Sequence, residues 1–307
     1  MDGNLGVSFK EFNRRVICDK ASMNLAVVAT QNRRCVPLLG TYVEFMVDCG
    51  DNDTQAKRYL NAMITRVRDI ERSMSFHELD SELSHINRLM PHCAYTMSED
   101  MTAVLNQVTE IHALSNGQFD CVRPVHALTS NGQLPDHGYY KEPDASWQDV
   151  VIDGSYLTVK RQVQLDLGGI AKGYAVDQAM RIVTNASSVI VNAGGDSCMH
   201  PWENSRVRLK YASNTGIGAL TIPMEQCSVA TSSTYYTNGT ASIIGDSIPV
   251  DTPIQTVSVF ADSCMIADAL TKLAWLSRDN RTQFKSVFDD YGACVYGIET
   301  NGTLIHY

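Results

Sequence analysis

The segment with the clearest chemical potential is Asp166–Asp177, which has the sequence Asp-Leu-Gly-Gly-Ile-Ala-Lys-Gly-Tyr-Ala-Val-Asp. A predicted strand ends at its acidic first residue, Gly168 and Gly169 permit a tight turn, and a predicted helix follows. The N-terminus of a helix offers N–H groups and partial positive charge to a phosphate, and Lys172 would add a formal charge. Spacing alone is also compatible with an ordinary strand–turn–helix and a solvated lysine. The segment therefore makes a phosphate-bearing ligand the first hypothesis.

The composition narrows the classes of protein and ligand. With 307 residues, 44% of them hydrophobic, the chain can bury the core of one large domain or of two closely packed lobes. A net charge of −9 leaves no broad basic face, so a general nucleic-acid-binding protein is excluded. A local basic pocket for one phosphorylated small molecule remains compatible. Neither GxGxxG nor GxxxxGK(S/T) occurs, so no Rossmann dinucleotide site and no P-loop are predicted.

Residues 1–30 have weak periodicity and are predicted to form an irregular lead-in to a single domain over 31–307, which could divide into two lobes. This N-terminal stretch contains basic residues but no sustained apolar run, so no signal peptide or lipoprotein signal is visible. No stretch reaches the roughly 18 consecutive apolar residues of a membrane-spanning helix. We expect a cytoplasmic protein from this sequence, or a periplasmic one if a targeting segment has been removed.

Hydrophobic periodicity predicts a mixture of helices and strands. Thr41–Asp48 is rich in β-branched and aromatic residues and is predicted to be a strand, and apolar residues at helical spacing predict a helix from Leu60 to Met74. Ser98, followed by two acidic residues, predicts the start of a helix that ends at Asn116-Gly117. Further helices are expected near Ala171–Thr184 and Ala267–Leu276, and further strands at Val150–Ile152, Tyr156–Val159, Val163–Leu165, Val189–Val191, Val207–Tyr211, Ala219–Ile222, Thr256–Phe260 and Ala293–Ile298. Because these elements do not alternate as strict βαβ units, an α+β fold is favoured over a doubly wound sheet.

Six further segments accompany Asp166–Asp177 in a fixed order. They are Leu38–Thr41 (Leu-Leu-Gly-Thr), Met74–His77 with Asp80–Leu83 and Asn87, Gly117–Asp120 (Gly-Gln-Phe-Asp), Asn192–Asp196 (Asn-Ala-Gly-Gly-Asp), Ala230–Ser232 (Ala-Thr-Ser) and Ala267–Thr271 (Ala-Asp-Ala-Leu-Thr). Their order and composition resemble the ApbE family, whose signature has an Asp, a small glycine-rich turn and an Ala-Lys-Gly-Tyr-Ala-Val-Asp run. The chain is thus identified as a member of that family, and the resemblance implies an ApbE-like, T-fold-like arrangement of mixed sheets packed with helices.

The resemblance also implies an activity and a set of site residues. Family members bind FAD with Mg²⁺ on the pyrophosphate, transfer the FMN part to a threonine hydroxyl of a target protein and release AMP. The resemblance assigns the metal to the backbone carbonyl of Gly169 and to Asp268, and oxygen ligands suit Mg²⁺. Asp268 would be catalytic through that metal, which would neutralise charge on the leaving AMP. The flavin side of the pocket would be formed by Leu39, His77, Gln118, Phe119, Asp120, Asp166 and Lys172.

Three positions carry less specific signals. Family members usually have a tyrosine where His77 stands, and an imidazole can also stack on an aromatic ring but offers less surface. Asn192–Asp196 is either a ligand contact or a structural turn. Lys272 stands where family members usually have a threonine as a further metal ligand. An ammonium cannot ligate a cation, so Lys272 could contact phosphate, and the hydroxyl of Thr271 could become the ligand.

A larger departure concerns the general base. Family transferases carry a His-Ile-x-(Asp/Asn)-Pro segment near residues 240–250, whereas this chain has no histidine between His200 and His306. The proton of an acceptor hydroxyl would then pass to Asp246, to Asp251, to a residue of the target or to metal-bound hydroxide. Loss of a general base typically costs a factor of about 10²–10⁴ in rate, which slows a transferase without abolishing it.

The leading prediction is Mg-dependent transfer of FMN from FAD to a threonine of an acceptor protein, with release of AMP. The acceptor would belong to a redox or electron-transport complex. With water as the acceptor, the same site would be an FAD pyrophosphatase that yields FMN and AMP. A chain that had lost the chemistry would be an FAD-binding assembly or carrier protein. Release of AMP separates both enzymes from the carrier, and a covalent flavin on the acceptor separates the transferase from the pyrophosphatase.

Overall fold

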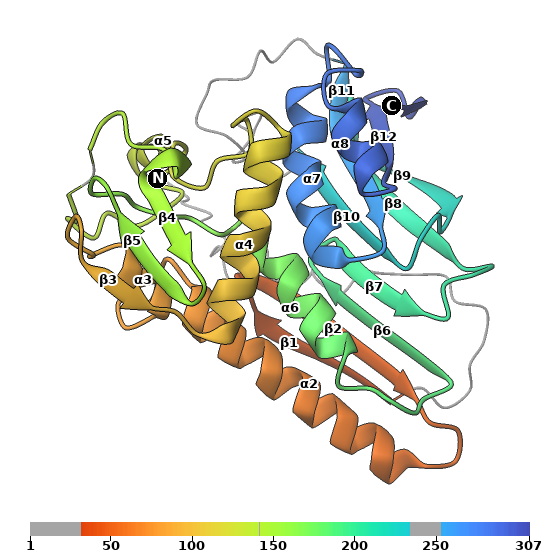
Figure 1. Cartoon of the computed structure of the whole chain (residues 1–307). Helices are drawn as coiled ribbons and strands as arrows, with labels where there is room; N and C mark the ends of the chain where they lie inside the picture. Colours follow the sequence, from red (N-terminus) through yellow and green to blue (C-terminus); the bar gives the residue numbers. More distant parts are fainter. Residues whose placement is uncertain (1–31, 141, 234–252) are drawn as a thin grey trace, which may run out of the picture.

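The computed structural model describes residues 32–140, 142–233 and 253–307, whose helices and strands are shown in Figure 1. The predicted lead-in over 1–30 and the candidate bases Asp246 and Asp251 lie outside these residues. Within them, helices pack on antiparallel sheets with no repeated βαβ unit, so the α+β prediction is confirmed.

The main element of the described residues is an eight-stranded antiparallel sheet in the order β1-β2-β6-β7-β10-β11-β12-β13. Its strands are β1 (Asn32–Leu38), β2 (Thr41–Asp48), β6 (Ser188–Ala193), β7 (Asp196–His200), β10 (Ser228–Ser233), β11 (Ile254–Ala261), β12 (Cys294–Glu299) and β13 (Leu304–His306). Successive side chains of a strand point to opposite faces of its sheet. Val191 and Val259 therefore join one buried cluster, while their neighbours Ile190 and Phe260 join another.

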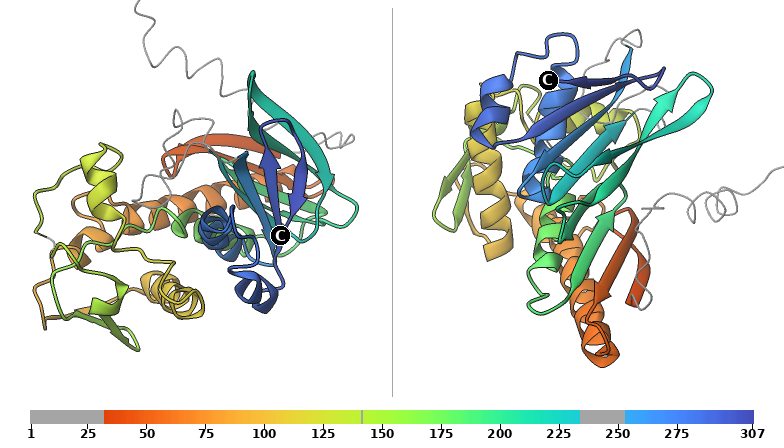
Figure 2. Two further views of the ribbon diagram at one scale, coloured as in Figure 1. Left: turned by 90° about the horizontal axis from the view of Figure 1, so that it is seen from above. Right: turned by 90° about the vertical axis from the view of Figure 1, so that its right-hand side faces the viewer.

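The two faces of this sheet are covered differently. Helices α2 (Asp53–Met74), α6 (Ala171–Met180) and α7 (Cys264–Leu276) pack on one face: α2 against β1 and β2, α6 against β6 and β7, and α7 mainly against β10 and β11. Figure 2 shows the same layer of helices from two further directions. The hairpin of β8 (Arg206–Ser213) and β9 (Gly216–Pro223) covers the other face, and α8 (Lys285–Asp290) precedes β12. The helix-covered face thus brings α6 and α7 side by side.

A smaller sheet lies beside the first, as the view from above in Figure 2 shows. Its strand order is β3 (Ala94–Thr96), β5 (Tyr156–Val159), β4 (Val150–Asp153). Helices α3 (Glu82–Ile86), α4 (Glu99–Leu114) and α5 (Val125–Ser130) accompany it, with a 3₁₀ turn at Trp147–Asp149. Leu157 of β5 belongs to the same buried cluster as Val43 of β2, so one hydrophobic core reaches both sheets.

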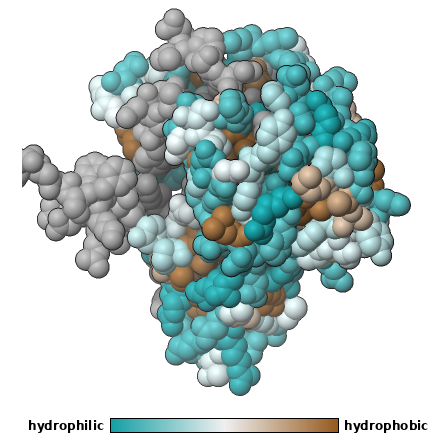
Figure 3. Space-filling view, turned by 90° about the vertical axis from the view of Figure 1, so that its left-hand side faces the viewer, coloured by the Kyte–Doolittle hydropathy of each residue, from teal (hydrophilic) through white to brown (hydrophobic). Residues whose placement is uncertain are grey.

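None of the helices in the described ranges is both long enough and apolar enough to cross a membrane. The longest, α2, has 22 residues with one buried face, formed by Leu60, Met63, Val67 and Ile70 among others. The side of the molecule drawn in Figure 3 is mostly hydrophilic, with hydrophobic residues scattered over it.

Two local predictions are wrong, and the structure explains the first of them. Val163 and Leu165 are buried, but the segment Val163–Leu165 forms no strand. The side-chain amide of Asn87 donates to the carbonyl of Leu165 at 3.0 Å and accepts from its N–H at 2.7 Å. One side chain therefore satisfies both backbone groups that a neighbouring strand would satisfy. The helix predicted to reach Thr184 ends at Met180.

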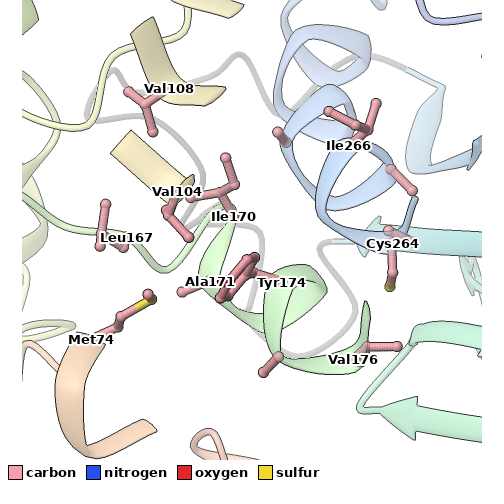
Figure 4. Close-up of a cluster of buried hydrophobic side chains, with 14 of the residues drawn as sticks. Met74, Val104, Val108, Leu167, Ile170, Ala171, Tyr174, Val176, Cys264 and Ile266 are labelled. Atoms are coloured by element: carbon pink, nitrogen blue, oxygen red, sulfur yellow. The ribbon is translucent and has the colours of Figure 1, made fainter. Parts of the chain in front are cut away.

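Helix α6 is fixed by apolar packing and by polar contacts, one set of which joins it to α2 and α4. Figure 4 shows Val104 of α4, Tyr174 of α6 and Cys264 of α7 in the buried cluster around the start of α6. The guanidinium of Arg66 donates to both carboxylate oxygens of Asp100 at 2.6 and 2.5 Å, and the hydroxyl of Tyr174 donates to the same carboxylate at 2.7 Å. This network ties α2, α4 and α6 together.

Replacing Asp100 by asparagine is expected to lower the free energy of unfolding near neutral pH by about 1–3 kcal/mol, because charge-assisted hydrogen bonds are lost. Hydrogen bonds from Arg66, and then from Tyr174, lower the pKa of Asp100 in the folded protein. The unfolded chain thus binds more protons in acid, and this contribution is complete above the unfolded value of about 3.9 and lost as the pH falls below it. Urea unfolding from pH 7 to pH 3 should show the difference between wild-type and Asp100→Asn proteins shrinking with falling pH. A difference that stays constant would contradict this account.

Candidate functional site

A cavity of 640 Å³ lies beside the glycine turn that precedes α6. This volume is in the range of about 300–1,000 Å³ that is usual for small-molecule sites. Eight residues that the sequence assigned to ligands line it: Leu39, His77, Gln118, Phe119, Asp120, Asp166, Gly169 and Lys172. They come from the turn between β1 and β2, the end of α2, the loop after α4 and the start of α6. The fold therefore gathers segments far apart in the chain around one space.

Lys172, in the first turn of α6, is anchored by two carboxylates. Its ammonium lies 2.7 Å from Oδ2 of Asp196 and 3.3 Å from Oδ2 of Asp268, and 3.4 Å from the carbonyl oxygen of Gly168. The N–H of Gly173 also donates to Oδ2 of Asp268 at 3.2 Å. The positive end of the cavity is thus formed by a lysine that the protein holds in place.

Lys272 brings a second ammonium to the same carboxylate from α7. Its Nζ lies 2.8 Å from Oδ1 and 3.2 Å from the backbone oxygen of Asp268, and 2.9 Å from Oγ1 of Thr271. The hydroxyl of Ser232, at the end of β10, is 3.5 Å away. A methyl group added to Gly169 would lie 3.0 Å from Cε of Lys272, so the lysine stem crosses the glycine turn closely. Lys272 and Ser232 both line the cavity.

The charges of this cluster depend on one another. Burial disfavours a charged Asp268, which is 1% exposed, but the ammonium groups of Lys172 and Lys272 hold the pKa of its carboxyl below the usual value. Burial also opposes the charge of Lys172, and the carboxylates of Asp196 and Asp268 outweigh this effect and raise its pKa. Burial raises the pKa of Asp196 in spite of its contact with Lys172. Two lysines and two carboxylates thus form a compact arrangement whose formal charges cancel.

The flavin-side residues have several roles. Phe119 is buried at the wall of the cavity, whereas His77 and Gln118 are exposed at its edge. The carboxylate of Asp120 accepts four hydrogen bonds from nearby residues, so it orders the loop after α4. The carboxylate of Asp166 accepts the N–H of Gly168 at 3.1 Å, and burial raises its pKa.

The predicted metal ligands do not offer a divalent cation a free set of oxygens in this arrangement. The hydroxyl of Thr271 donates to the backbone oxygen of Asp268 at 2.6 Å and accepts from Lys272 at 2.9 Å and from Ser232 at 3.0 Å. A hydroxyl has one proton and two lone pairs, so none remains for a metal. One carboxylate oxygen of Asp268 faces Lys272 and the other faces Lys172. The residues present therefore do not fit Mg²⁺ as they stand.

Residues 39–284 match the model of the ApbE family. The chain belongs to the ApbE family. Among its curated relatives, the FAD:protein FMN transferase of Chlamydia pneumoniae is 28% identical over 72% of this chain and 79% of its own length. The FAD:protein FMN transferase of Haemophilus influenzae is 24% identical over 81% of this chain and 83% of its own length.

Solved structures of ApbE proteins share the fold. The flavin transferase ApbE from Vibrio cholerae superposes with a TM-score of 0.74 at 20% identity and covers 91% of this chain and 97% of its own. The ApbE protein from Thermotoga maritima superposes with a TM-score of 0.73 at 21% identity, over 90% and 97% of the two chains. The ApbE-like fold predicted from the sequence is confirmed.

Two residues of this ApbE-family site were not assigned from the sequence. Asp196 follows the Gly194-Gly195 turn and was only part of a segment that could be structural, yet its carboxylate anchors Lys172. Ser232 lay in the Ala-Thr-Ser segment, and its hydroxyl donates to Thr271. Both residues lie in segments that resemble those of the family. Only the pairing of strands β6, β7 and β10 shows that their side chains reach the cluster of Lys172, Lys272 and Asp268.

Proposed function

We propose that this protein transfers FMN from FAD to a hydroxyl group of an acceptor protein and releases AMP. Membership of the ApbE family and the shared name of its relatives support the activity. The finer features are also proposals: the acceptor residue is a threonine, and the acceptor belongs to a redox or electron-transport complex. The Mg²⁺ expected from the family resemblance is not part of this proposal, because the residues present do not fit it, and no step below depends on it.

The observation that carries this proposal is the cavity beside the glycine turn. Its lining combines the apolar residues Leu39 and Phe119 with the two lysines Lys172 and Lys272. An apolar wall suits a flavin ring, and two cations suit a pyrophosphate. FAD is a ligand that carries both groups in one molecule.

The transfer step exchanges one phosphorus–oxygen bond for another. The acceptor hydroxyl oxygen attacks the phosphorus of the FMN part, and the bond from that phosphorus to the bridging oxygen breaks. AMP leaves with the bridging oxygen, and the proton of the hydroxyl passes to a base. Positioning and charge stabilisation dominate reactions of this kind, and Lys172 and Lys272 supply both on the phosphate side.

The test is incubation of the purified protein with FAD, with and without an established protein acceptor of an ApbE-family transferase. We expect AMP on nucleotide chromatography and an FMN-sized mass gain on the acceptor. Lys172→Met should weaken FAD binding about tenfold or more, since a charge-assisted contact is lost. Lys285→Met is the matched control, because Lys285 pairs with Asp289 on the surface.

Other results would replace the proposal. AMP and free FMN without a mass gain would identify an FAD pyrophosphatase. Tight FAD binding without AMP would identify an FAD-binding carrier or assembly protein. Failure of FAD to bind at all would exclude each of these functions.

A further inference from the structure

The ammonium of Lys272 lies where the oxygens expected to hold a metal converge. Three oxygens of Asp268 and Thr271 lie within 3.2 Å of it, and the hydroxyl of Ser232 lies at 3.5 Å. The side chain is 13% exposed, so these contacts form in a largely dry environment. An ammonium that donates to several oxygens at such distances satisfies them as a small cation would.

We propose that Lys272 takes the place of the divalent cation, so that the protein binds FAD and promotes AMP release without Mg²⁺. This inference rests on the proposed function. The tethered ammonium of Lys272, together with that of Lys172, lies beside the pyrophosphate and attracts its oxygens, which is the part that a metal would otherwise take.

The position of the cavity supports this role. Lys172, Lys272 and Gly169 line the cavity, whereas Asp268 and Thr271 do not. The two lysine side chains therefore lie between the buried carboxylate and the space that a ligand would enter. A phosphate in that space would contact Lys272 and would be kept from contact with Asp268.

Charge balance supports it independently. Lys172 and Lys272 already balance Asp196 and Asp268, so a divalent cation bound at Asp268 would bring two further positive charges close to an ammonium. Repulsion between like charges is strong in a buried site. A neutral threonine at this position would leave Lys172 facing two carboxylates, and the excess negative charge would attract a cation.

The charge balance predicts that replacing Lys272 by threonine makes FAD binding depend on Mg²⁺. Wild-type protein, freed of divalent ions with EDTA, should bind FAD with an affinity within about twofold of that in millimolar Mg²⁺. In Lys272→Thr protein, FAD binding in EDTA should weaken about tenfold or more, and Mg²⁺ should restore it. Quenching of flavin fluorescence measures the affinity, and the melting temperature without FAD reports Mg²⁺ binding directly.

The matched control is Lys285→Thr, which removes a lysine of another i,i+4 pair with an aspartate on the surface. It should behave as wild type in EDTA and in Mg²⁺. Wild-type affinity for FAD that rises about tenfold with Mg²⁺ would overturn the inference and leave the proposed function intact. No FAD binding under either condition would overturn the proposed function and the inference with it. If Lys272→Thr does not fold, the two wild-type measurements decide alone.

Discussion

Replacing Asp268 by asparagine is expected to lower the free energy of unfolding by about 3–5 kcal/mol. The variant should also release AMP from FAD about 100-fold more slowly than the wild type. Asp268 is 1% exposed and contacts the ammonium groups of both Lys172 and Lys272. Asparagine keeps the shape but not the charge, so two partly buried lysines would lose the carboxylate that they share. Urea unfolding measures the first effect, and chromatography of AMP measures the second.

A double variant tests whether the charge imbalance is the cause. Asp268→Asn combined with Lys272→Met restores an equal number of lysines and carboxylates, so it should be more stable than Asp268→Asn alone by at least about 1 kcal/mol. The matched control is Asp289→Asn, whose carboxylate is 59% exposed and pairs with Lys285. Its effect on stability should stay within about 0.5 kcal/mol. The account is wrong if Asp268→Asn is no less stable than that control.

The elements that could be predicted are those whose pattern is complete within the segment itself. The strand Thr41–Asp48 has the predicted bounds, and α4 begins after the predicted cap, where the hydroxyl of Ser98 accepts the N–H of Met101. Strand β1 was not predicted, because Asn32–Leu38 is polar, contains Pro37 and buries only Leu38. It is a strand because its residues pair in register with β2, which is a property of the partner.

Part of the site could also be predicted, because some of its segments have a pattern that is complete within the segment itself. The segments around Phe119, Asp166 and Lys172 are recognisable in the sequence, and the cavity brings them together. The place of the Lys272 ammonium could not be predicted, since it depends on the packing of a long side chain over Gly169. The sequence shows a lysine at position 272, where family members usually have a threonine. Only the structure shows that this lysine contacts Asp268.

Gly173→Ala is expected to destabilise the protein strongly. A methyl group at Gly173 would lie 2.6 Å from the carbonyl carbon of Cys264 and 2.7 Å from Cα of Met265. Both are backbone atoms at the start of α7, so α6 and α7 would have to separate. Over-packing of this kind costs about 1–3 kcal/mol, and we expect the upper end although alanine favours a helix by about 1 kcal/mol.

The same substitution should also weaken FAD binding, because α6 carries Lys172 and α7 carries Asp268 and Lys272. Gly297→Ala is the control, since its methyl group would lie 3.0–3.1 Å from side-chain atoms of Tyr307 and Ile254, which can shift. Urea unfolding should place Gly173→Ala well below Gly297→Ala in stability, and flavin fluorescence should show reduced affinity only in Gly173→Ala. Equal stability of the two variants would show that α6 and α7 can separate at little cost. In that case the close approach of α6 and α7 would not be what brings Lys172 and Lys272 into contact with Asp268.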